Sequence, residues 1–300
     1  MKLAIIGAGK WGQALYHAYS QQNRVVITSR RPKDIKNFVS LDKALDYEYL
    51  IMALPAQVVR NWMSEKFIDR GQNILVAAKG IETSTGAFLN EIYSDFLSAD
   101  RLAFISGPSF ASEVQLSLPT ALKISSSNLE LAQIYADALP NYIRGYIDND
   151  VVGAEIAGAY KNVIAIASGV CDGLKLGNNA RASLISRGLV EMTRFGEYFG
   201  AKIETFLSLG GAGDLFLTAS STLSRNYRVG LGLAEGKSIK EILEELGEVA
   251  EGIPTTKALY HIAQKENIYL PIASEVYNML EGKEPSLSVN DLLRSDNSLG

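Results

Sequence analysis

The fold is decided by residues 3–16, which read Leu3-Ala4-Ile5-Ile6-Gly7-Ala8-Gly9-Lys10-Trp11-Gly12-Gln13-Ala14-Leu15-Tyr16. A short apolar run leads into the pattern G-x-G-x-x-G and then into a helical segment, which is the order typical of a dinucleotide-binding unit. In such a unit Gly7 makes the tight turn, Gly9 lets the backbone approach a pyrophosphate, and Gly12 lets helix and strand pack closely. The helix N-terminus offers N–H groups to phosphates. We therefore predict a dinucleotide site, the alternative being a plain glycine turn.

The rest of the first half alternates apolar strand segments with helical ones. This alternation predicts an α/β fold with a Rossmann-like, doubly wound parallel sheet that helices cover on both faces. Strands are predicted at residues 3–6, 24–28, 49–54, 74–78 and 102–105, and at the far edge at 120–124 and 142–147. Helices between them are predicted at residues 57–65 and 85–96.

The second half shows no clear strand pattern. Helical patterns cover residues 151–170, 180–199, 215–224 and 239–246. We predict a dinucleotide-binding domain over residues 1–150 and an all-helical substrate domain over residues 151–300. The polar end of the chain after Asp296 is predicted to be disordered.

Composition narrows the class of protein. The chain is 47% hydrophobic and 21% charged, as in ordinary soluble globular proteins, and its net charge of −4 implies no basic surface for nucleic acid. One cysteine, Cys171, fits a reducing cytoplasm, and the two histidines argue against a His-based metal site. No apolar run is long enough to span a membrane. The apolar content of the second domain permits a homodimer.

The end of the second predicted strand indicates which dinucleotide binds. An NAD site usually carries an acid there for the ribose 2′-OH, but this chain reads Thr28-Ser29-Arg30-Arg31-Pro32. The paired guanidinium groups of Arg30 and Arg31 suit the 2′-phosphate of NADP, and the alternative is a solvated basic corner. We predict NADP(H) as the cofactor, with NAD(H) as a second candidate.

Two further stretches follow predicted strands, whose carboxyl ends face the ligand in parallel-sheet proteins. They read Lys79-Gly80-Ile81-Glu82 and Gly107-Pro108-Ser109-Phe110-Ala111. Lys79 is either a surface lysine or a ligand-binding residue, and its place beside the predicted cleft favours the second interpretation. Ser109 is a candidate N-cap for a helix over residues 110–115, whose end would point N–H groups toward the cleft.

Lys161 is the most informative residue of the second half. On a helix over residues 151–170 it shares a face with residues three and four positions away, most of which are small. Lysine is rarely buried without a partner, so a ligand beside Lys161 is the favoured interpretation. The alternative is a lysine whose stem reaches to solvent.

A glycine-rich turn and the helix after it supply the other polar candidates. Asp214 has the spacing of an N-cap for a helix over residues 215–224, and its carboxylate is also a candidate partner for Lys161. The end of that helix reads Ser224-Arg225-Asn226. Arg225 is a candidate fork for a phosphate and Asn226 a candidate amide donor. The alternative for Arg225 is a cation that stabilises a helix C-terminus.

Together these stretches resemble the bacterial NAD(P)-dependent glycerol-3-phosphate dehydrogenase family over residues 1 to about 258. The matching motifs lie at residues 7–12, 79–82, 107–111, 155–162, 186–189, 213–215, 224–226 and 251–252. The chain departs from the family pattern at Lys10, where Ser or Thr is common, at Ala212, where Leu is usual, and in a shorter segment between Arg31 and Tyr49.

The resemblance implies a cytoplasmic enzyme that interconverts dihydroxyacetone phosphate and sn-glycerol 3-phosphate with NAD(P)(H) and supplies glycerophospholipid synthesis. It implies that Lys161 is the catalytic proton donor and acceptor, with Asp214 orienting it. The implied substrate-binding residues are Lys79, Gly107, Ser109, Lys161, Asp214, Ser224, Arg225 and Asn226. The implied cofactor-binding residues are Gly7, Gly9, Lys10, Trp11, Gly12, Arg30, Arg31, Lys79, Ala111, Arg225 and Glu251. No metal is implied.

Two other functions fit the same residue types. One is another NADP-dependent reductase of similar two-domain build that acts on a 2-keto or 3-hydroxy acid, because a carboxylate substrate also needs Arg or Lys. The other is a non-enzymatic NADPH-binding protein, which needs the glycine motif and the arginine pair but not Lys161 with Asp214.

Overall fold

The computed structural model describes residues 1–294, so the tail after Asp296 lies outside the described residues. The chain forms two compact units. Unit 1 comprises Met1–Lys79 and Phe88–Glu155, and unit 2 comprises Gly80–Ala87 and the chain from Ile156 onward.

This division differs from the predicted boundary after residue 150 in two respects. A single helix, α7 (Val151–Gly173), runs through the division, so the sequence pattern changes several residues before the packing does. The segment Gly80–Ala87 belongs to unit 2 because its residues pack there. The Thr83 hydroxyl donates to the Pro254 carbonyl at 3.1 Å.

Within the described residues, unit 1 holds a seven-stranded sheet in the order β2-β1-β3-β4-β5-β6-β7. The strands are β1 (Lys2–Ile6), β2 (Arg24–Thr28), β3 (Tyr49–Met52), β4 (Asn73–Val76), β5 (Leu102–Ser106), β6 (Thr120–Ser125) and β7 (Ile143–Asp148). The predicted α/β fold is confirmed, and the two late strands lie at the far edge as predicted. One pairing was not predicted: β6 runs antiparallel to β5, and β7 then runs parallel to β6.

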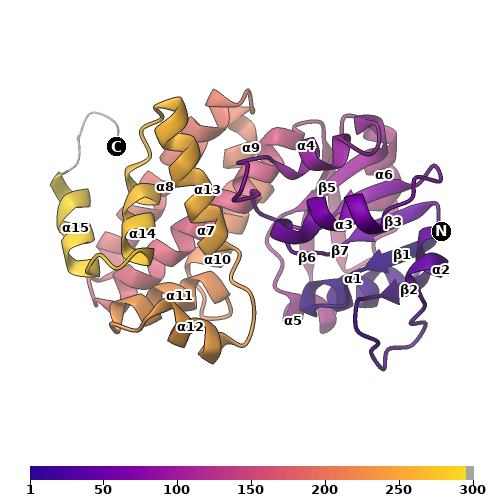
Figure 1. Ribbon diagram of the computed structural model, residues 1–300, viewed down its shortest axis with the longest axis horizontal. Helices are drawn as coiled ribbons and strands as arrows, with labels where there is room; N and C mark the ends of the chain where they lie inside the picture. Colours follow the sequence, from indigo (N-terminus) through magenta and orange to yellow (C-terminus); the bar gives the residue numbers. More distant parts are fainter. Residues whose placement is uncertain (295–300) are drawn as a thin grey trace. The chain divides into compact units, whose positions relative to one another are not determined.

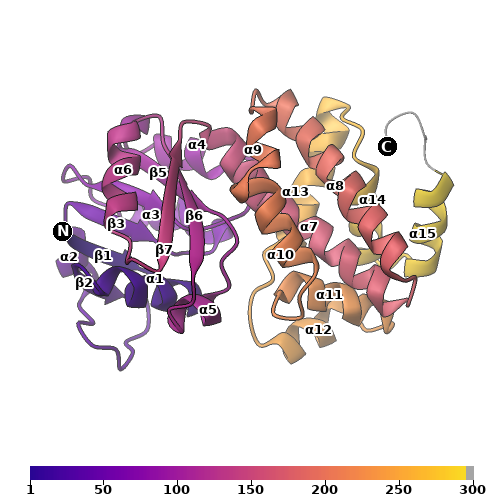
Figure 2. The same cartoon turned by 180° about the vertical axis from the view of Figure 1, so that it is seen from behind.

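Helices cover both faces of this sheet, because successive strand side chains point to opposite sides and both sets are apolar. Figure 1 shows α3 in front of the sheet. Figure 2, the view from the opposite side, shows α6 in front of the other face. The helices of unit 1 are α1 (Lys10–Ser20), α2 (Leu41–Leu45), α3 (Val59–Lys66), α4 (Leu89–Ser94), α5 (Ala111–Gln115) and α6 (Leu129–Asp137).

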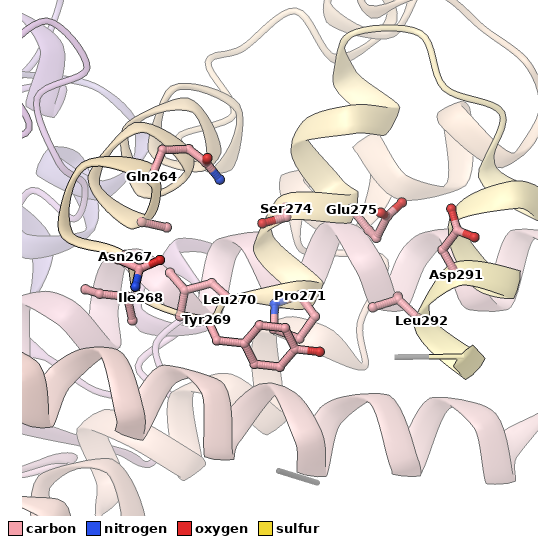
Figure 3. A pocket seen from close by; sticks show the side chains of 11 residues that line it. Gln264, Asn267, Ile268, Tyr269, Leu270, Pro271, Ser274, Glu275, Asp291 and Leu292 are labelled. Atoms are coloured by element: carbon pink, nitrogen blue, oxygen red, sulfur yellow. The ribbon is translucent and has the colours of Figure 1, made fainter. Parts of the chain in front are cut away.

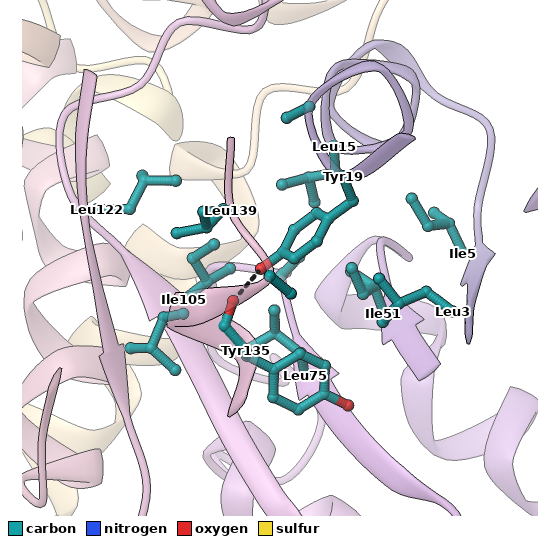
Figure 4. Packing of buried hydrophobic residues seen from close by; sticks show 14 of the residues in the cluster. Leu3, Ile5, Leu15, Tyr19, Ile51, Leu75, Ile105, Leu122, Tyr135 and Leu139 are labelled. Carbon is teal, nitrogen blue, oxygen red and sulfur yellow. Dashed lines mark hydrogen bonds between the residues drawn. The ribbon is translucent and has the colours of Figure 1, made fainter. Parts of the chain in front are cut away.

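The core between the sheet and helices α1 and α6 contains two buried tyrosines (Figure 4). The Tyr19 hydroxyl donates to the Tyr135 carbonyl at 3.2 Å. The Tyr135 hydroxyl lies 3.0 Å from the Leu50 carbonyl and 2.9 Å from the Asn73 carbonyl. Each buried hydroxyl therefore has a partner, which offsets the cost of removing it from water.

Unit 2 is helical, and no strand occurs between residues 151 and 294. After α7 it contains α8 (Asn178–Tyr198), α9 (Ile203–Leu207), α10 (Asp214–Ala219), α11 (Arg225–Ala234), α12 (Ile239–Leu246), α13 (Gly252–Glu266), α14 (Pro271–Leu280) and α15 (Pro285–Arg294). Helices α7 and α11 cross at backbone contact. A Cβ on Gly169 would lie 2.0 Å from the Tyr227 carbonyl oxygen, and one on Gly230 would lie 2.0 Å from that of Ile166.

Two predicted helices were wrong at one end. The helix predicted over residues 85–96 begins only at Leu89, because Gly86 adopts a φ of +77° and closes a turn with Glu82. The helix predicted over residues 215–224 ends at Ala219, where a run of Ser and Thr follows. The Ser221 hydroxyl accepts the N–H of Leu223 at 3.1 Å, and such local bonds compete with helix continuation.

Glu155, in the first turns of α7, is a buried carboxyl group. One of its oxygens accepts the N–H of Asn90 at 2.9 Å, at the start of α4. Its other oxygen has no hydrogen-bond partner among the described residues. Burial, the largest cause, raises the pKa of Glu155 from 4.5 to about 8. The folded state therefore binds this proton more tightly than the unfolded state does, so stability falls as pH rises through this window.

We expect the free energy of unfolding to fall between about pH 5 and pH 8, and Glu155→Gln to remove part of that fall. The amide keeps the oxygen that accepts the Asn90 N–H and never becomes charged. Urea unfolding at pH 5, 7 and 9 measures this, with Glu130→Gln, an exposed carboxyl on α6, as the control. A pH profile of Glu155→Gln parallel to that of the wild type would contradict the assignment.

Candidate functional site

The glycine turn between β1 and α1 has the geometry that its motif predicts. Gly7 adopts a φ of +112°, and a Cβ on it would lie 2.3 Å from the Ala53 carbonyl oxygen. A Cβ on Gly12 would lie 1.8 Å from the Gly7 carbonyl oxygen, so the third glycine lets α1 pack against the turn. A Cβ on Gly9 would meet nothing within 4 Å. Open space at Gly9 fits a ligand that approaches the backbone there.

Helix α1 starts beside that space. Gly9 is the N-cap residue of α1. Because glycine has no side chain, no side-chain oxygen caps the N–H groups of the first turn, which contains Lys10 and Trp11. The first N–H groups of a helix have no partner within the helix. The Trp11 indole N–H is buried and has no hydrogen-bond partner among the described residues. The backbone N–H groups of this first turn fit the phosphates of a dinucleotide.

Arg30 and Arg31 follow β2 and are both exposed. Neither guanidinium makes a hydrogen bond or ion pair with another described residue. Their exposed donors are therefore open to an anionic ligand.

Lys79, Gly107 and Ser109 lie together beyond the ends of β4 and β5. The Lys79 ammonium donates to the Gly107 carbonyl at 3.4 Å, and the Ser109 hydroxyl donates to the same oxygen at 3.1 Å. Ser109 is not the predicted N-cap, because α5 starts at Ala111 with Phe110 at the cap. Its hydroxyl turns back toward Gly107 instead, which leaves Ala111 in the first turn of α5.

Lys161 is buried in unit 2, with 7% of its surface exposed, so it is not a lysine that reaches to solvent. Its ammonium forms an ion pair with Asp214, as predicted, and donates to the Thr218 hydroxyl at 2.9 Å. The Thr218 hydroxyl also donates to Asp214 Oδ1 at 3.3 Å. Sequence reasoning missed Thr218, although its spacing of four residues from Asp214 on one helix is a usable signal.

Asp214 is not an N-cap. A π-helical turn over Leu209–Gly213 leads directly into α10, so Asp214 already has helical backbone angles. Its carboxylate is not a helix cap and points to Lys161 instead. Fully buried carboxylates require such a partner, and Asp214 is only 1% exposed.

Arg225 lies at the start of a helix rather than at the end of one. Ser224 caps α11, with its hydroxyl accepting the N–H of Tyr227 at 3.2 Å. The macrodipole disfavours a cation at a helix N-terminus, so helix stabilisation does not explain Arg225. Glu248 compensates part of its charge at 3.2 Å, and the Arg225 side chain stays 43% exposed.

Asn226 links α11 to the start of α13. Its Oδ1 accepts the N–H of Gly252 at 2.9 Å, which directs its amide N–H groups away from Gly252. Glu251, the N-cap residue of α13, lies beside this contact. A Cβ on Gly252 would lie 2.7 Å from Asn226 Oδ1 and 3.0 Å from the Asn162 carbonyl oxygen. The residue after Lys161 therefore lies close to Asn226.

A separate cavity of about 480 Å³ in unit 2 contains none of the predicted site residues (Figure 3). Two acidic residues on its wall, Glu275 and Asp291, both pair with Lys283. Among residues 1–294, no group of three or more His, Cys, Asp or Glu side chains could hold a metal ion. In the same range, no helix combines the length and apolar character that crossing a membrane requires.

Comparison with known proteins gives a consistent result. The N-terminal model of NAD-dependent glycerol-3-phosphate dehydrogenase matches residues 22–132, and the C-terminal model matches residues 150–290. A glycerol-3-phosphate dehydrogenase (NAD(P)+) of Sulfurimonas denitrificans is 61% identical over 292 residues, which cover 97% of this chain and 99% of that protein. Its counterpart in Campylobacter lari is 59% identical and covers 98% of each chain. The crystal structure of glycerol-3-phosphate dehydrogenase from Coxiella burnetii has a TM-score of 0.90 at 34% identity, covering 97% of this chain and 98% of that one.

The glycine turn allows a matched pair of substitutions. We expect Gly9→Ala to fold with unchanged stability, because its Cβ meets no protein atom, but to weaken NADPH binding about tenfold or more. We expect Gly12→Ala to lower the free energy of unfolding by about 1–3 kcal/mol, because its Cβ overlaps the Gly7 carbonyl. Urea unfolding and fluorescence titration with NADPH separate the two effects. Wild-type affinity for NADPH in Gly9→Ala would exclude a ligand from this space.

Proposed function

Because the chain belongs to the NAD-dependent glycerol-3-phosphate dehydrogenase family and is an NAD(P)-dependent oxidoreductase, we propose how its own residues carry out the reaction. The reaction interconverts dihydroxyacetone phosphate and sn-glycerol 3-phosphate. The observation that supports the assignment of roles is the buried contact of Lys161 with Asp214 and Thr218.

Unit 1 binds the cofactor in this proposal. The N–H groups at the start of α1 bind the pyrophosphate, and the space at Gly9 admits it. Arg30 and Arg31 bind the 2′-phosphate, which makes NADP(H) the preferred cofactor. When bound, the reduced nicotinamide supplies the hydride that reduces the carbonyl carbon of dihydroxyacetone phosphate. In unit 1, Lys10, Trp11, Lys79 and Ala111 are further proposed cofactor contacts, and in unit 2 Arg225 and Glu251 are.

Lys161 acts as the proton donor in the direction of ketone reduction. As the carbonyl carbon accepts a hydride, the carbonyl oxygen gains negative charge, and an ammonium beside it stabilises that charge and delivers a proton. Asp214 and Thr218 each bind the Lys161 Nζ and thereby restrict its position. In the reverse direction, the amine of Lys161 takes the proton back from the hydroxyl group.

The phosphate of the substrate binds at the start of α11. The Arg225 guanidinium offers a planar fork for phosphate oxygens, and the Asn226 amide offers N–H groups that Gly252 does not use. An anion there would also compensate the unfavourable placement of Arg225 against the helix macrodipole. Lys79, Gly107, Ser109 and Ser224 complete the proposed substrate contacts.

A homodimer and a cytoplasmic location stay predictions from the sequence.

We expect Lys161→Met to lower kcat for NADPH oxidation with dihydroxyacetone phosphate by about 10²–10⁴-fold, the usual loss of a general acid. NADPH affinity, measured by fluorescence titration, should remain close to that of the wild type. Because Lys161→Met leaves Asp214 buried without its partner, the double variant with Asp214→Asn tests the same loss in a better balanced fold. Lys240→Met, an exposed lysine on α12, is the control. Near-normal turnover of the folded double variant would refute the role of Lys161.

We expect Arg225→Met to reduce kcat/KM for dihydroxyacetone phosphate by about 10- to 100-fold, because one charge-assisted contact to phosphate is lost. Activity with dihydroxyacetone, which lacks the phosphate, should fall far less. Arg225→Lys keeps the charge but not the fork and should lie between the two. Steady-state kinetics with both ketones decides the point, and an equal loss on both would place Arg225 elsewhere in the reaction.

A further inference from the structure

Strand β2 is the edge strand of the sheet, and a long loop connects it to α2 (Figure 1). Side-chain hydrogen bonds hold this loop in place. The Tyr16 hydroxyl donates to the Lys36 carbonyl at 2.6 Å, and the Asn37 amide donates to the Val25 carbonyl at 3.3 Å. Phe38 forms a parallel bridge with Ile27. The loop is therefore held against β2 and α1 before any ligand binds.

One of these ties is a cation on the glycine turn. The Lys33 ammonium donates to the Ala8 carbonyl at 2.6 Å, and the Gln13 amide donates to the same oxygen at 3.0 Å. Ala8 is the residue between Gly7 and Gly9, so Lys33 connects the loop after β2 with the turn that is open to a ligand.

Among residues 1–294, no carboxylate lies within 4.0 Å of the Lys33 ammonium. An ammonium has three N–H donors, and the bond to Ala8 uses one of them. Lys33 forms no ion pair with a described residue, although Asp34 is its neighbour in the chain. The side chain is exposed, so its remaining donors face solvent. Holding an unpaired cation against a carbonyl oxygen prepares it for an anion.

The position of this cation corresponds to one part of a dinucleotide. In this class of fold the residue that holds the ribose 2′-OH follows the second strand, while the glycine turn binds the adjoining pyrophosphate. A ribose bound in this way would lie between the end of β2 and the glycine turn. Lys33 follows β2 and is bonded to the glycine turn, so its ammonium would lie next to the ribose.

We propose that Lys33 binds the ribose 2′-phosphate of NADP(H) and contributes to the choice of NADP(H) over NAD(H). This inference rests on the proposed function, because it assumes that a dinucleotide binds at the glycine turn. Arg30 and Arg31 are exposed, and their guanidinium groups have no hydrogen bond or ion pair with a described residue, whereas the Lys33 ammonium is oriented by its bond to Ala8. A pre-oriented cation loses less conformational entropy when the phosphate binds.

The test measures the adenosine half of the cofactor alone. Isothermal titration calorimetry with 2′,5′-ADP and with 5′-AMP compares ligands that differ by the 2′-phosphate. Lys33→Met should raise the Kd for 2′,5′-ADP by about 10- to 100-fold, as expected for the loss of one charge-assisted hydrogen bond. The Kd for 5′-AMP should rise much less. The ratio of kcat/KM for NADPH to that for NADH should fall by a similar factor. Arg30→Ala should act in the same direction.

Three variants separate charge from tethering. Lys33→Arg keeps the cation and should retain most of the preference for 2′,5′-ADP, whereas Lys33→Gln keeps a donor for Ala8 without charge and should resemble Lys33→Met. Lys36→Met removes an exposed cation from the same loop whose ammonium makes no hydrogen bond or ion pair with a described residue, and it should match the wild type. Thermal unfolding confirms that each variant folds.

The proposal is overturned if Lys33→Met weakens both ligands equally, which indicates a loop tether alone, or weakens neither. It is also overturned if the wild type does not distinguish the two ligands. A wild-type protein that prefers 2′,5′-ADP through Lys33 but does not oxidise NADPH with dihydroxyacetone phosphate would refute the proposed function and leave this inference intact.

Discussion

The ion pair of Lys161 with Asp214 is the interaction on which the helical unit depends. Removing an ammonium and a carboxylate from water costs several kcal/mol each, so neither can be buried unless the other reaches it. Helix α10 must therefore present Asp214 to α7, and the π-helical turn before α10 makes this possible without a capping role for the carboxylate. Thr218, one turn later, supplies the second partner of the ammonium. The groups proposed for proton transfer are thus also the ones that restrict how α7 and α10 pack.

Close backbone contacts position the remaining groups of the same unit. Gly169 and Gly230 let α7 and α11 approach until no side chain fits between them. This crossing sets where α11 begins relative to α7, and the Asn226 bond to Gly252 connects that point to α13. Unit 1 uses the same device at Gly7 and Gly12, where the missing Cβ atoms let a helix and a strand meet around a turn that stays open at Gly9. In both units, backbone proximity places the polar groups.

Much of the fold could be predicted because its signals are local. Each buried strand is an apolar run, and the β2 strand was predicted at its observed bounds of Arg24 to Thr28. The ends of elements were less predictable, because Ser, Thr and Asp have competing local options. Ser224 was predicted near the end of one helix, but it is the N-cap of the next. The interaction of Arg225 with the helix dipole is therefore unfavourable instead of favourable. The antiparallel direction of β6 relative to β5 could not be predicted, because strand direction depends on partners distant in the chain.

The sequence by itself determined the α/β class, the helical second half, the glycine turn with its arginine pair, and the family, because these are carried by composition, periodicity and motifs of consecutive residues. Only the tertiary structure decided that Thr218 joins Lys161 and Asp214, that Lys33 reaches Ala8, and that Glu155 is buried with one unpartnered oxygen. Its folded contacts also placed Gly80–Ala87 in the second unit. The reason is physical: which side chains meet across a turn or a helix crossing depends on backbone approach and side-chain direction, and the spacing of residues along the chain specifies neither.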